Sequence, residues 1–233
     1  MIKKIFAFLI IVGLLFIFSV MLLNYTGAVD LSGVAKDYVQ RGPKELGAMN
    51  LVTAIVVTYR GFDTLGEVTV LFLAATGIAV FFRKSGGVSK PKEIREKREA
   101  SEILLTGVRF LSPVILMFGV YIFINGHLSP GGGFQGGAVI TTMVLLLFLS
   151  DSSYKINHTV FGLIESFSGA TYVFVGLLGI FLAGGFLDNR ILPLGEFGKI
   201  LSAGAIPIIY SLIGLKVGTE LASILDNMKG EIE

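Results

Sequence analysis

Long apolar runs separated by short polar segments divide the chain. A helix of about 20 mostly apolar residues spans the roughly 30 Å hydrocarbon core of a bilayer, and its backbone groups are paired within the segment. The runs that approach or reach this length are Ile5–Leu23, Thr64–Phe82, Ile103–Ile124, Phe134–Leu149, Val160–Leu182 and Leu201–Lys216. The pattern predicts an all-α, polytopic integral membrane protein with about six transmembrane helices.

The first run follows Lys3 and Lys4, a charge pattern that also occurs in signal peptides. The run is longer than the roughly 7–15 apolar residues of such a peptide, and no A-x-A cleavage site follows it. We therefore expect a first span that is retained in the mature protein.

Basic residues predict the orientation, because cytoplasmic loops carry an excess of Lys and Arg. With the N-terminus inside, twelve of the 19 Lys and Arg lie on the cytoplasmic side, six lie on the opposite side and Arg109 lies within a span. Both termini should then be cytoplasmic, in a multi-pass protein of the cell membrane.

Turn-forming and charged residues after the second span predict a division of the chain. The segment Ser-Gly-Gly-Val-Ser-Lys-Pro-Lys at 85–92 is followed by a run of alternating charges. We expect a two-span module over residues 1–84, a charged cytoplasmic linker over 85–99 and a four-span domain over 100–233.

Composition agrees with this fold class and excludes several functions. Hydrophobic residues make up 53% of the chain and charged residues 15%, and the mean hydropathy is +0.80. A net charge of +2 argues against a nucleic-acid binder, which would carry a large excess of basic residues. The chain has no cysteine, which excludes disulfides, thiolate metal ligation and cysteine nucleophiles within it.

A first group of charged residues precedes and enters the second span. Arg60, Asp63 and Glu67 lie close together in sequence, and the two acids share a helical face at i,i+4. Burial raises the pKa of a carboxyl group and a nearby guanidinium lowers it, so one acid could switch its charge near neutral pH. The alternative is that Arg60 pairs with Asp63 and leaves Glu67 as the only free acid.

A glycine-rich segment joins the third and fourth spans. Its candidate structural residues are Pro130, Gly131, Gly132, Gly133, Gly136 and Gly137. The segment matches G-x-G-x-x-G, but that motif indicates nucleotide binding only within a βαβ unit, which this chain lacks. The glycines favour close helix packing, and His127 either stabilises the loop by a hydrogen bond or carries a proton.

Charged residues also occur in the last two spans. Glu165 belongs to a polar stripe with Ser168, Gly169 and Tyr172, beside a small-residue stripe of Gly162, Ser166 and Ala170 that predicts a helix contact. An acid at this depth serves transport, or lies near the cytoplasmic edge and extends to water. Lys216 and Glu220 stand at i,i+4, and we expect an interfacial ion pair.

Two segments resemble known antiporter subunits. The sequence GHLSPGGGFQGG at 126–137 resembles the signature of the MnhB/MrpB family, whose four-span subunit fits residues 100–225. Residues 51–82, with RGFDTLGE at 60–67, are similar to the carboxyl-terminal region of the large Mrp antiporter subunit.

The resemblance implies a fused subunit of a multi-subunit Na⁺/H⁺ antiporter module, as in Mrp complexes and in archaeal respiratory hydrogenases and sulfur reductases. It implies that Glu67 lies on an ion pathway with Asp63 as its neighbour, and that the chain carries no cofactor or redox centre. The expected partners are other Mrp-type subunits, membrane lipid, Na⁺ and H⁺, and a hydrogenase-like or sulfur-reductase arm, with no nucleic acid.

The leading hypothesis is a non-catalytic transport subunit with Glu67, Asp63, Arg60, Glu165 and His127 on an ion path. A purely structural scaffold subunit is the alternative. A stand-alone membrane enzyme is disfavoured, because neither a nucleophile–base pair nor a metal cluster emerges from the sequence.

Overall fold

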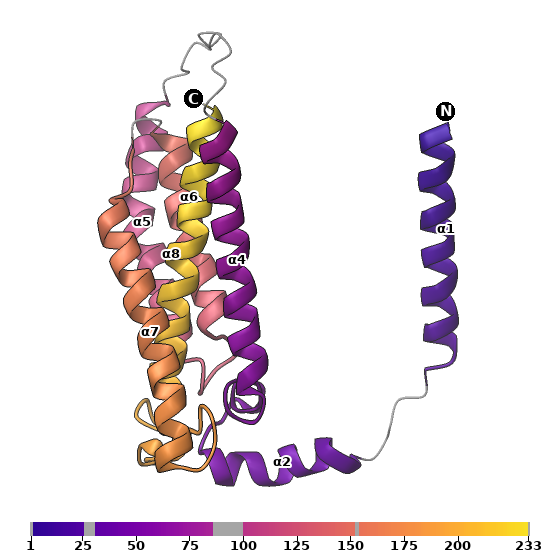
Figure 1. Ribbon diagram of the computed structural model, residues 1–233, viewed down its shortest axis with the longest axis vertical. Coiled ribbons are helices and arrows are strands. Elements are labelled where there is room, and N and C mark those ends of the chain that lie inside the picture. Colours follow the sequence, from indigo (N-terminus) through magenta and orange to yellow (C-terminus); the bar gives the residue numbers. More distant parts are fainter. Residues whose placement is uncertain (1, 26–30, 86–99, 152–153, 233) are drawn as a thin grey trace. The chain divides into compact units, whose positions relative to one another are not determined.

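The described part of the chain consists of helices joined by loops. The computed structural model describes residues 2–25, 31–85, 100–151 and 154–232, and no strand occurs in these ranges (Figure 1). The elements are α1 (Ile2–Leu23), α2 (Gly33–Leu46), α3 (Leu51–Ala54), the π-helical turn η1 (Ile55–Tyr59), α4 (Gly61–Ser85), α5 (Glu102–Ile124), α6 (Gly133–Ser150), α7 (His158–Leu182), the 3₁₀ turn η2 (Asn189–Ile191) and α8 (Ile206–Ile232). The all-α prediction is confirmed. The predicted linker over 85–99 lies outside the described residues, apart from Ser85.

Six helices are long and apolar enough to cross a membrane, as predicted. Their spans are Lys4–Leu23, Gly61–Phe82, Glu102–Ile124, Gly133–Ser150, His158–Leu182 and Ile206–Lys229. The first five lie within a few residues of the predicted spans. The prediction for the last, Leu201–Lys216, was wrong, because residues 201–205 belong to the preceding loop and α8 continues to Ile232.

Two compact units make up the chain, residues 1–36 and 37–233. The first unit contains α1, whose side chains from Lys4 to Leu23 are all exposed and almost all apolar. A helix that is apolar on every side is suited to contact with lipid or with other membrane subunits.

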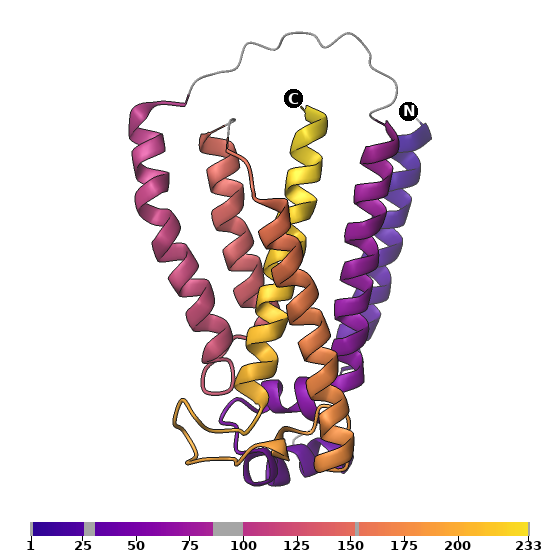
Figure 2. The same ribbon diagram turned by 60° about the vertical axis from the view of Figure 1, so that its left-hand side comes forward.

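The second unit is a bundle of α4, α5, α6, α7 and α8 (Figures 1 and 2). Each of the other long helices of this bundle packs against α8, which is the most buried of them. The short elements α3, η1 and η2 and the longer loops gather at the end where α8 begins, and the C-terminus lies at the opposite end (Figure 2). Helix α8 is therefore the element around which the bundle is organised.

Glycines bring α5, α6 and α8 into close contact. A Cβ at Gly136 would lie 2.7 Å from the Gly119 carbonyl oxygen of α5. A Cβ at Gly137 would lie 2.9 Å from the Gly214 carbonyl oxygen and 2.9 Å from the Gly218 amide nitrogen of α8. Since membrane helices gain little from hydrophobic association, such close backbone approach is a main source of their packing energy.

The contact at Gly137 can be tested by adding one methyl group. Gly137→Ala places that group against backbone atoms that cannot rotate away, and should lower the free energy of unfolding by about 1–3 kcal/mol. Gly77→Ala in α4 is the matched control, because nothing lies within 4 Å of its Cβ position. Thermal unfolding in detergent should show a lower midpoint for Gly137→Ala only, and equal midpoints would contradict the packing role.

Candidate functional site

The segment before the second span contains a broken helix. Helix α3 widens into the π-helical turn η1, the chain leaves helical geometry at Arg60, and α4 begins at Gly61. The Thr64 hydroxyl donates a 2.8 Å hydrogen bond to the Val56 carbonyl oxygen, which compensates part of the interrupted ladder. π-Helical turns of this kind are frequent at functional sites.

Arg60, Asp63 and Glu67 lie at the start of α4 on the outer side of the bundle. Arg60 forms an ion pair with Asp63, and both side chains are exposed. Glu67 is also exposed, and within the described residues it has neither a hydrogen bond nor an ion-pair partner. This arrangement agrees with the second interpretation of the sequence, in which Arg60 pairs with Asp63 and Glu67 has no ion-pair partner within the described residues.

Glu67 nonetheless belongs to the electrostatic environment of the bundle interior. Its carboxylate interacts electrostatically with the hydroxyl groups of Tyr172 in α7 and Tyr210 in α8. Both tyrosines are buried, and the Tyr172 hydroxyl has no hydrogen-bond partner among the described residues. Glu67 therefore lies at the boundary between the interior of this chain and whatever surrounds α4.

Three charged side chains meet farther inside the bundle. The Lys216 ammonium lies 2.6 Å from the Glu220 Oε1 atom and 3.9 Å from the Glu165 Oε1 atom. It also lies 5.1 Å from the centre of the Phe72 ring of α4. We call Glu165, Lys216 and Glu220 the charged triad; it joins α7 to α8 beside α4.

Lys216 and Glu220 lie far from both ends of α8, whereas Glu165 lies about two turns into α7. At a rise of about 1.5 Å per residue, Lys216 is about 15 Å and Glu220 about 21 Å along α8 from Ile206. Glu165 is about 10 Å along α7 from His158. The predicted interfacial position of the Lys216–Glu220 pair was wrong, because α8 continues beyond it to Ile232.

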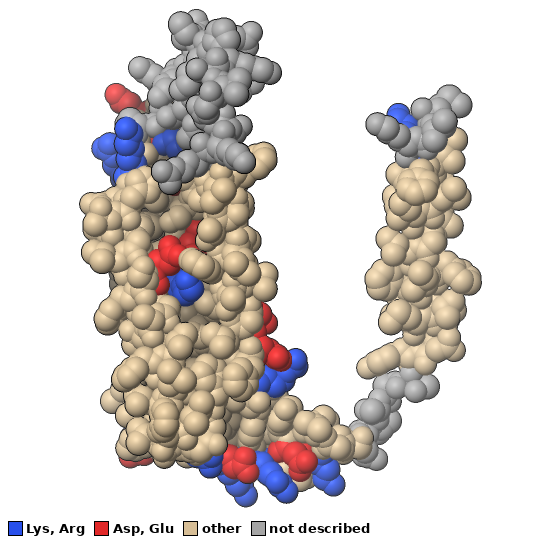
Figure 3. Space-filling view, in the orientation of Figure 1, with Lys and Arg blue, Asp and Glu red and all other residues tan. Residues whose placement is uncertain are grey.

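The triad is only partly accessible. Figure 3 shows acidic and basic side chains together in a hollow in the middle of the bundle, where the surrounding surface carries no charge. The side chains of Glu165 and Lys216 are 23% and 11% exposed, whereas that of Glu220 is 0% exposed. The site is thus open on the Glu165 side and closed around Glu220.

The polar stripe of α7 faces the bundle. Ser168 and Tyr172 are buried, and a Cβ at Gly169 would lie 3.4 Å from Cδ of Lys216, so this glycine leaves room for the lysine stem. The small-residue stripe faces the opposite way. Gly162, Ser166 and Ala170 are exposed, so the helix contact predicted for them is not made within the described residues and stays a prediction for a neighbouring helix. In α7 the side that carries the polar groups makes the contact with α8.

The glycine-rich loop is held by the segment that precedes the second span. The Asn50 side-chain amide donates 2.9 Å hydrogen bonds to the carbonyl oxygens of Gly126 and Ser129, and the Asn50 backbone amide donates to His127. The Thr53 hydroxyl donates a 2.6 Å hydrogen bond to Gly126. This contact connects the two parts of the chain that resemble different antiporter subunits.

His127 is buried in this loop. Its Nε2 atom lies 3.3 Å from the Lys199 carbonyl oxygen, and its Nδ1 atom has no partner among the described residues. Burial lowers the pKa of His127 below its ordinary value, although the hydrogen bond to the Lys199 backbone opposes this effect. The geometry is that of a neutral imidazole that supports a loop.

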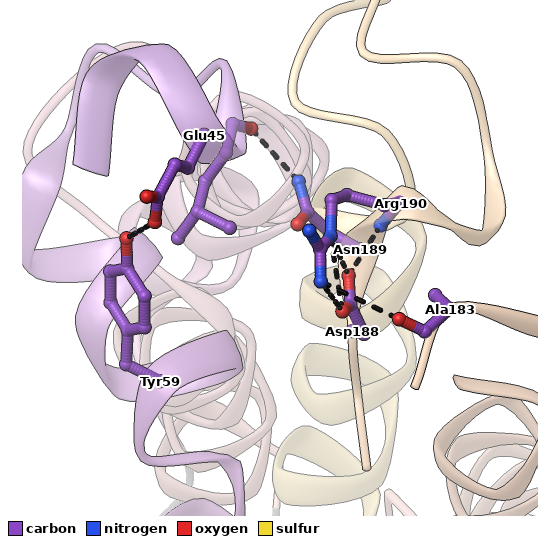
Figure 4. A network of polar contacts seen from close by, with 7 residues as sticks. Glu45, Tyr59, Ala183, Asp188, Asn189 and Arg190 are labelled. Carbon is purple, nitrogen blue, oxygen red and sulfur yellow. Dashed lines mark hydrogen bonds and ion pairs between the residues drawn. The ribbon is translucent and has the colours of Figure 1, made fainter. Parts of the chain in front are cut away.

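A second connection lies at the same end of the bundle (Figure 4). The Asn189 side-chain amide donates 2.8 Å hydrogen bonds to the carbonyl oxygens of Leu46 and Ala203, which ties α2 to the loop before α8. Beside it, Arg190 binds Asp188 through two nitrogen atoms. Burial alone would raise the pKa of Asp188, but the hydrogen bonds and charge of Arg190 outweigh it and hold that pKa below its usual value.

Tyr59 lies at the edge of this network. Its hydroxyl donates a 2.6 Å hydrogen bond to a Glu45 carboxylate oxygen. Burial, together with that hydrogen bond and the Glu45 charge, raises the pKa of Tyr59 to about 12. The hydroxyl therefore remains protonated and fixes η1 to α2 at any physiological pH.

The candidate residues from the sequence thus lie in three places: Arg60, Asp63 and Glu67 on the outer side of the start of α4, Glu165 in the triad, and His127 in the glycine-rich loop. The described residues contain no cluster of three or more His, Cys, Asp or Glu side chains that could hold a metal ion. Lys216 and Glu220 are the site residues whose depth in the span was predicted wrongly. Apolar residues continue after this i,i+4 pair, and that continuation indicates a pair inside the span.

The lowered pKa of His127 predicts a pH dependence of stability. The unfolded chain takes up a proton near pH 6.5 and the folded chain resists it, so stability is complete above that pH and declines as the pH falls from about 7 to about 5. His127→Gln should flatten this decline in thermal unfolding, whereas His158→Gln, which removes an exposed imidazole, should leave it in place. A decline of equal steepness in His127→Gln would contradict this role.

Comparison with known proteins supplies relatives for both parts of the chain. An uncharacterized protein of Methanocaldococcus jannaschii is 32% identical over 191 residues, which cover 72% of each chain. The B subunit of a Na⁺/H⁺ antiporter of Bacillus subtilis is 31% identical over 90 residues, 39% of this chain and 57% of the relative. The A/B subunit of a probable K⁺/H⁺ antiporter of Rhizobium meliloti is 30% identical over 137 residues, 50% of this chain and 14% of the relative.

Two solved structures share the fold. A chain of the membrane-bound sulfane sulfur reductase, an archaeal respiratory membrane complex, has a TM-score of 0.81 and 45% identity, with 98% of both chains covered. A chain of the Mrp complex from Dietzia sp. DQ12-45-1b has a TM-score of 0.75 and 24% identity, with 95% of this chain and 25% of that chain covered, a likeness of fold alone.

Family models match both parts as well. The MbhE model, which describes the E subunit of MBH, matches residues 5–93. The model described as a domain related to the MnhB subunit of Na⁺/H⁺ antiporters matches residues 103–223, more than half of the 233 residues. The chain is thus a multi-pass membrane protein that belongs to the family of MnhB-related antiporter subunits.

Proposed function

We propose that this subunit contributes part of the pathway along which Na⁺ or H⁺ crosses the membrane in an Mrp-type antiporter module. The charged triad is the observation that carries the proposal. It places two carboxylates and one ammonium group inside a bundle whose surrounding surface is apolar. Ionisable groups within membrane spans are costly, and they commonly serve the movement of ions or protons.

Stability alone does not account for the triad. A buried ion pair seldom stabilises a protein more than apolar side chains of similar size, because both charges lose their hydration. When both acids are ionised, the triad carries two negative charges and one positive charge. One negative charge therefore remains after Lys216 has paired with an acid. Such an excess charge is unfavourable for a scaffold and suitable for a site that receives a cation or a proton.

Glu67 extends the proposed pathway to the surface of α4. An exposed carboxylate within a membrane span, without a partner among the described residues, requires a polar neighbour outside this unit. We assign that neighbour to an adjoining membrane subunit of the module. Asp63 and Arg60, which lie closer to the end of the helix, would form the rim of the same path.

The relatives favour a place among several membrane subunits, and the chemistry of this chain favours a non-catalytic one. One structural relative belongs to a sulfane sulfur reductase complex and another to an Mrp complex. This chain has no cysteine with which to ligate an iron–sulfur cluster. We therefore place any redox chemistry of such an assembly in other subunits.

Removing the charge of the most buried acid tests the proposal. Glu220→Gln in the assembled complex keeps the size of the side chain and removes its negative charge. A change of about 1.4 kcal/mol in the energy of an ion along its path alters the rate about tenfold, so we expect at least about a tenfold loss of ion transport in vesicles.

Glu196→Gln is the matched control for this experiment. Glu196 also pairs with a lysine, Lys199, but both side chains are exposed in the loop before α8. Its replacement should leave transport unchanged. Normal assembly and undiminished transport in both Glu220→Gln and Glu165→Gln would remove the triad from the pathway and leave a scaffold subunit.

A separate experiment concerns the outer acid. Glu67→Gln should strongly reduce coupled transport while the complex assembles normally, because an uncharged amide at this position cannot exchange a proton or bind a cation as firmly. Thr69→Val, on an exposed position of the same helix, removes a hydroxyl that bonds only to its own helix at Leu65. It should leave transport intact, and equal effects of the two variants would assign this face of α4 to assembly.

A further inference from the structure

The triad holds three ionisable groups with two charges of one sign and one of the other. Lys216 lies between the acids, closer to Glu220 at 2.6 Å than to Glu165 at 3.9 Å. One ammonium group can neutralise only one carboxylate. The second carboxylate needs another cation or a proton in this apolar surrounding.

Glu220 has an oxygen atom without a partner. Lys216 binds Oε1, whereas Oε2 is buried and accepts no hydrogen bond within the described residues. A carboxylate oxygen that is fully buried and receives no donor is unfavourable as long as it carries charge. A proton on this oxygen would remove the unfavourable free energy of a buried charge without a hydrogen-bond donor.

The position that a metal cation would need is already taken. The Lys216 ammonium occupies the space between the carboxylates, and its stem passes over Gly169 and beside Phe72. Na⁺ requires several oxygen ligands around it, and the described residues gather no third acidic or imidazole group at this place. The composition of the site therefore favours a proton over Na⁺.

Other titratable groups do not supply the missing charge. Those along the spans packed around the triad include Glu67 of α4, Arg109 of α5, His158 and Tyr172 of α7, and Asp226 and Lys229 of α8, and α6 has no charged residue. His158 pairs with Asp226 nearer the end of the bundle, Arg109 is exposed, and Lys229 lies over Phe148.

We propose that Glu165, Lys216 and Glu220 form a proton-binding site that holds one proton between the two carboxyl groups, while the Lys216 ammonium pairs with whichever carboxylate is ionised. The proposal rests on the proposed role of the triad in ion movement and specifies the ion. A proton that leaves Glu165 and reaches Glu220 breaks the Lys216–Glu220 ion pair and allows a Lys216–Glu165 ion pair to form. The net charge of the triad is the same before and after this transfer.

The two acids differ in their access to the surface of the bundle. We therefore expect the proton to pass from the accessible acid to the enclosed one. Glu165 is partly exposed at the hollow, and Glu220 is enclosed. A proton would enter from the hollow through Glu165 and reach the interior at Glu220. Lys216 would move the short distance between them, from 2.6 Å at one acid toward the other.

Infrared difference spectroscopy of the purified complex tests this site through the carbonyl absorption of protonated carboxyl groups. Glu165→Gln and Glu220→Gln should each lose the absorption of one protonated carboxyl, because the remaining acid then pairs with Lys216 as a carboxylate. Lys216→Met should gain the absorption of one, because two uncompensated acids both become protonated. Glu196→Gln should leave the spectrum unchanged.

Opposite results overturn the inference. Spectra that stay the same in Glu165→Gln and Lys216→Met, both in complexes that assemble, would exclude a shared proton, and so would a wild-type signal that appears only after Na⁺ is replaced by choline. Transport measured on the same samples separates the two proposals. Lost transport with unchanged spectra supports the ion pathway and overturns the proton site, whereas changed spectra with full transport support the proton site and overturn its role in transport.

Discussion

The ion pair between Lys216 and Glu220 is the constraint on which the bundle depends. Helix α8 packs against every other long helix of the second unit, and most of its side chains in the middle of the span are buried. In the structure the two charges lie 2.6 Å apart as an ion pair, and the Phe72 ring and Gly169 lie beside the lysine. Loss of the lysine would leave Glu220 buried without a cation, whereas loss of the Glu220 charge would leave Lys216 with Glu165 as its partner.

The remaining architecture keeps this pair in place. On one side of α8, glycines let α6 approach closely enough for backbone contact at Gly137, Gly214 and Gly218. On the other side, the polar stripe of α7 brings Glu165 within reach of Lys216. At the end where α8 begins, Asn50 and Asn189 bind the loops to the segment before α4. Tight packing and buried hydrogen bonds thus fix the helices that position the charges.

Much of the fold follows from local sequence, and the failures have a common cause. The apolar runs predict five spans well because length and hydropathy alone determine them. The last span was misplaced because Lys216 and Glu220 were taken to mark the edge of the membrane. A charged pair ends a span only if it faces water, and whether it does is decided by the helices packed around it.

The site was predictable only in part for the same reason. In α7 both stripes are compatible with a helix contact, since lipid and protein interior are equally apolar and the sequence does not say which side faces in. Asn50 and Asn189 carry no distinguishing pattern at all, because their partners at Gly126, Ser129 and Leu46 are distant in sequence and meet only when the loops are folded. Glu67, by contrast, stands out in the sequence as a candidate because acidic residues within a span are rare, and its role stays a prediction.

The hydrogen bonds of Asn50 and Thr53 have a mechanical consequence. They tie the segment before α4 to the glycine-rich loop, at the end of the bundle where α8 begins. A helix whose first turn follows such a fixed segment cannot shift along the bundle at that end unless these hydrogen bonds break. The side of the opening beside Lys216 that α4 lines is therefore anchored by contacts that lie at the end of the bundle and not at the opening itself.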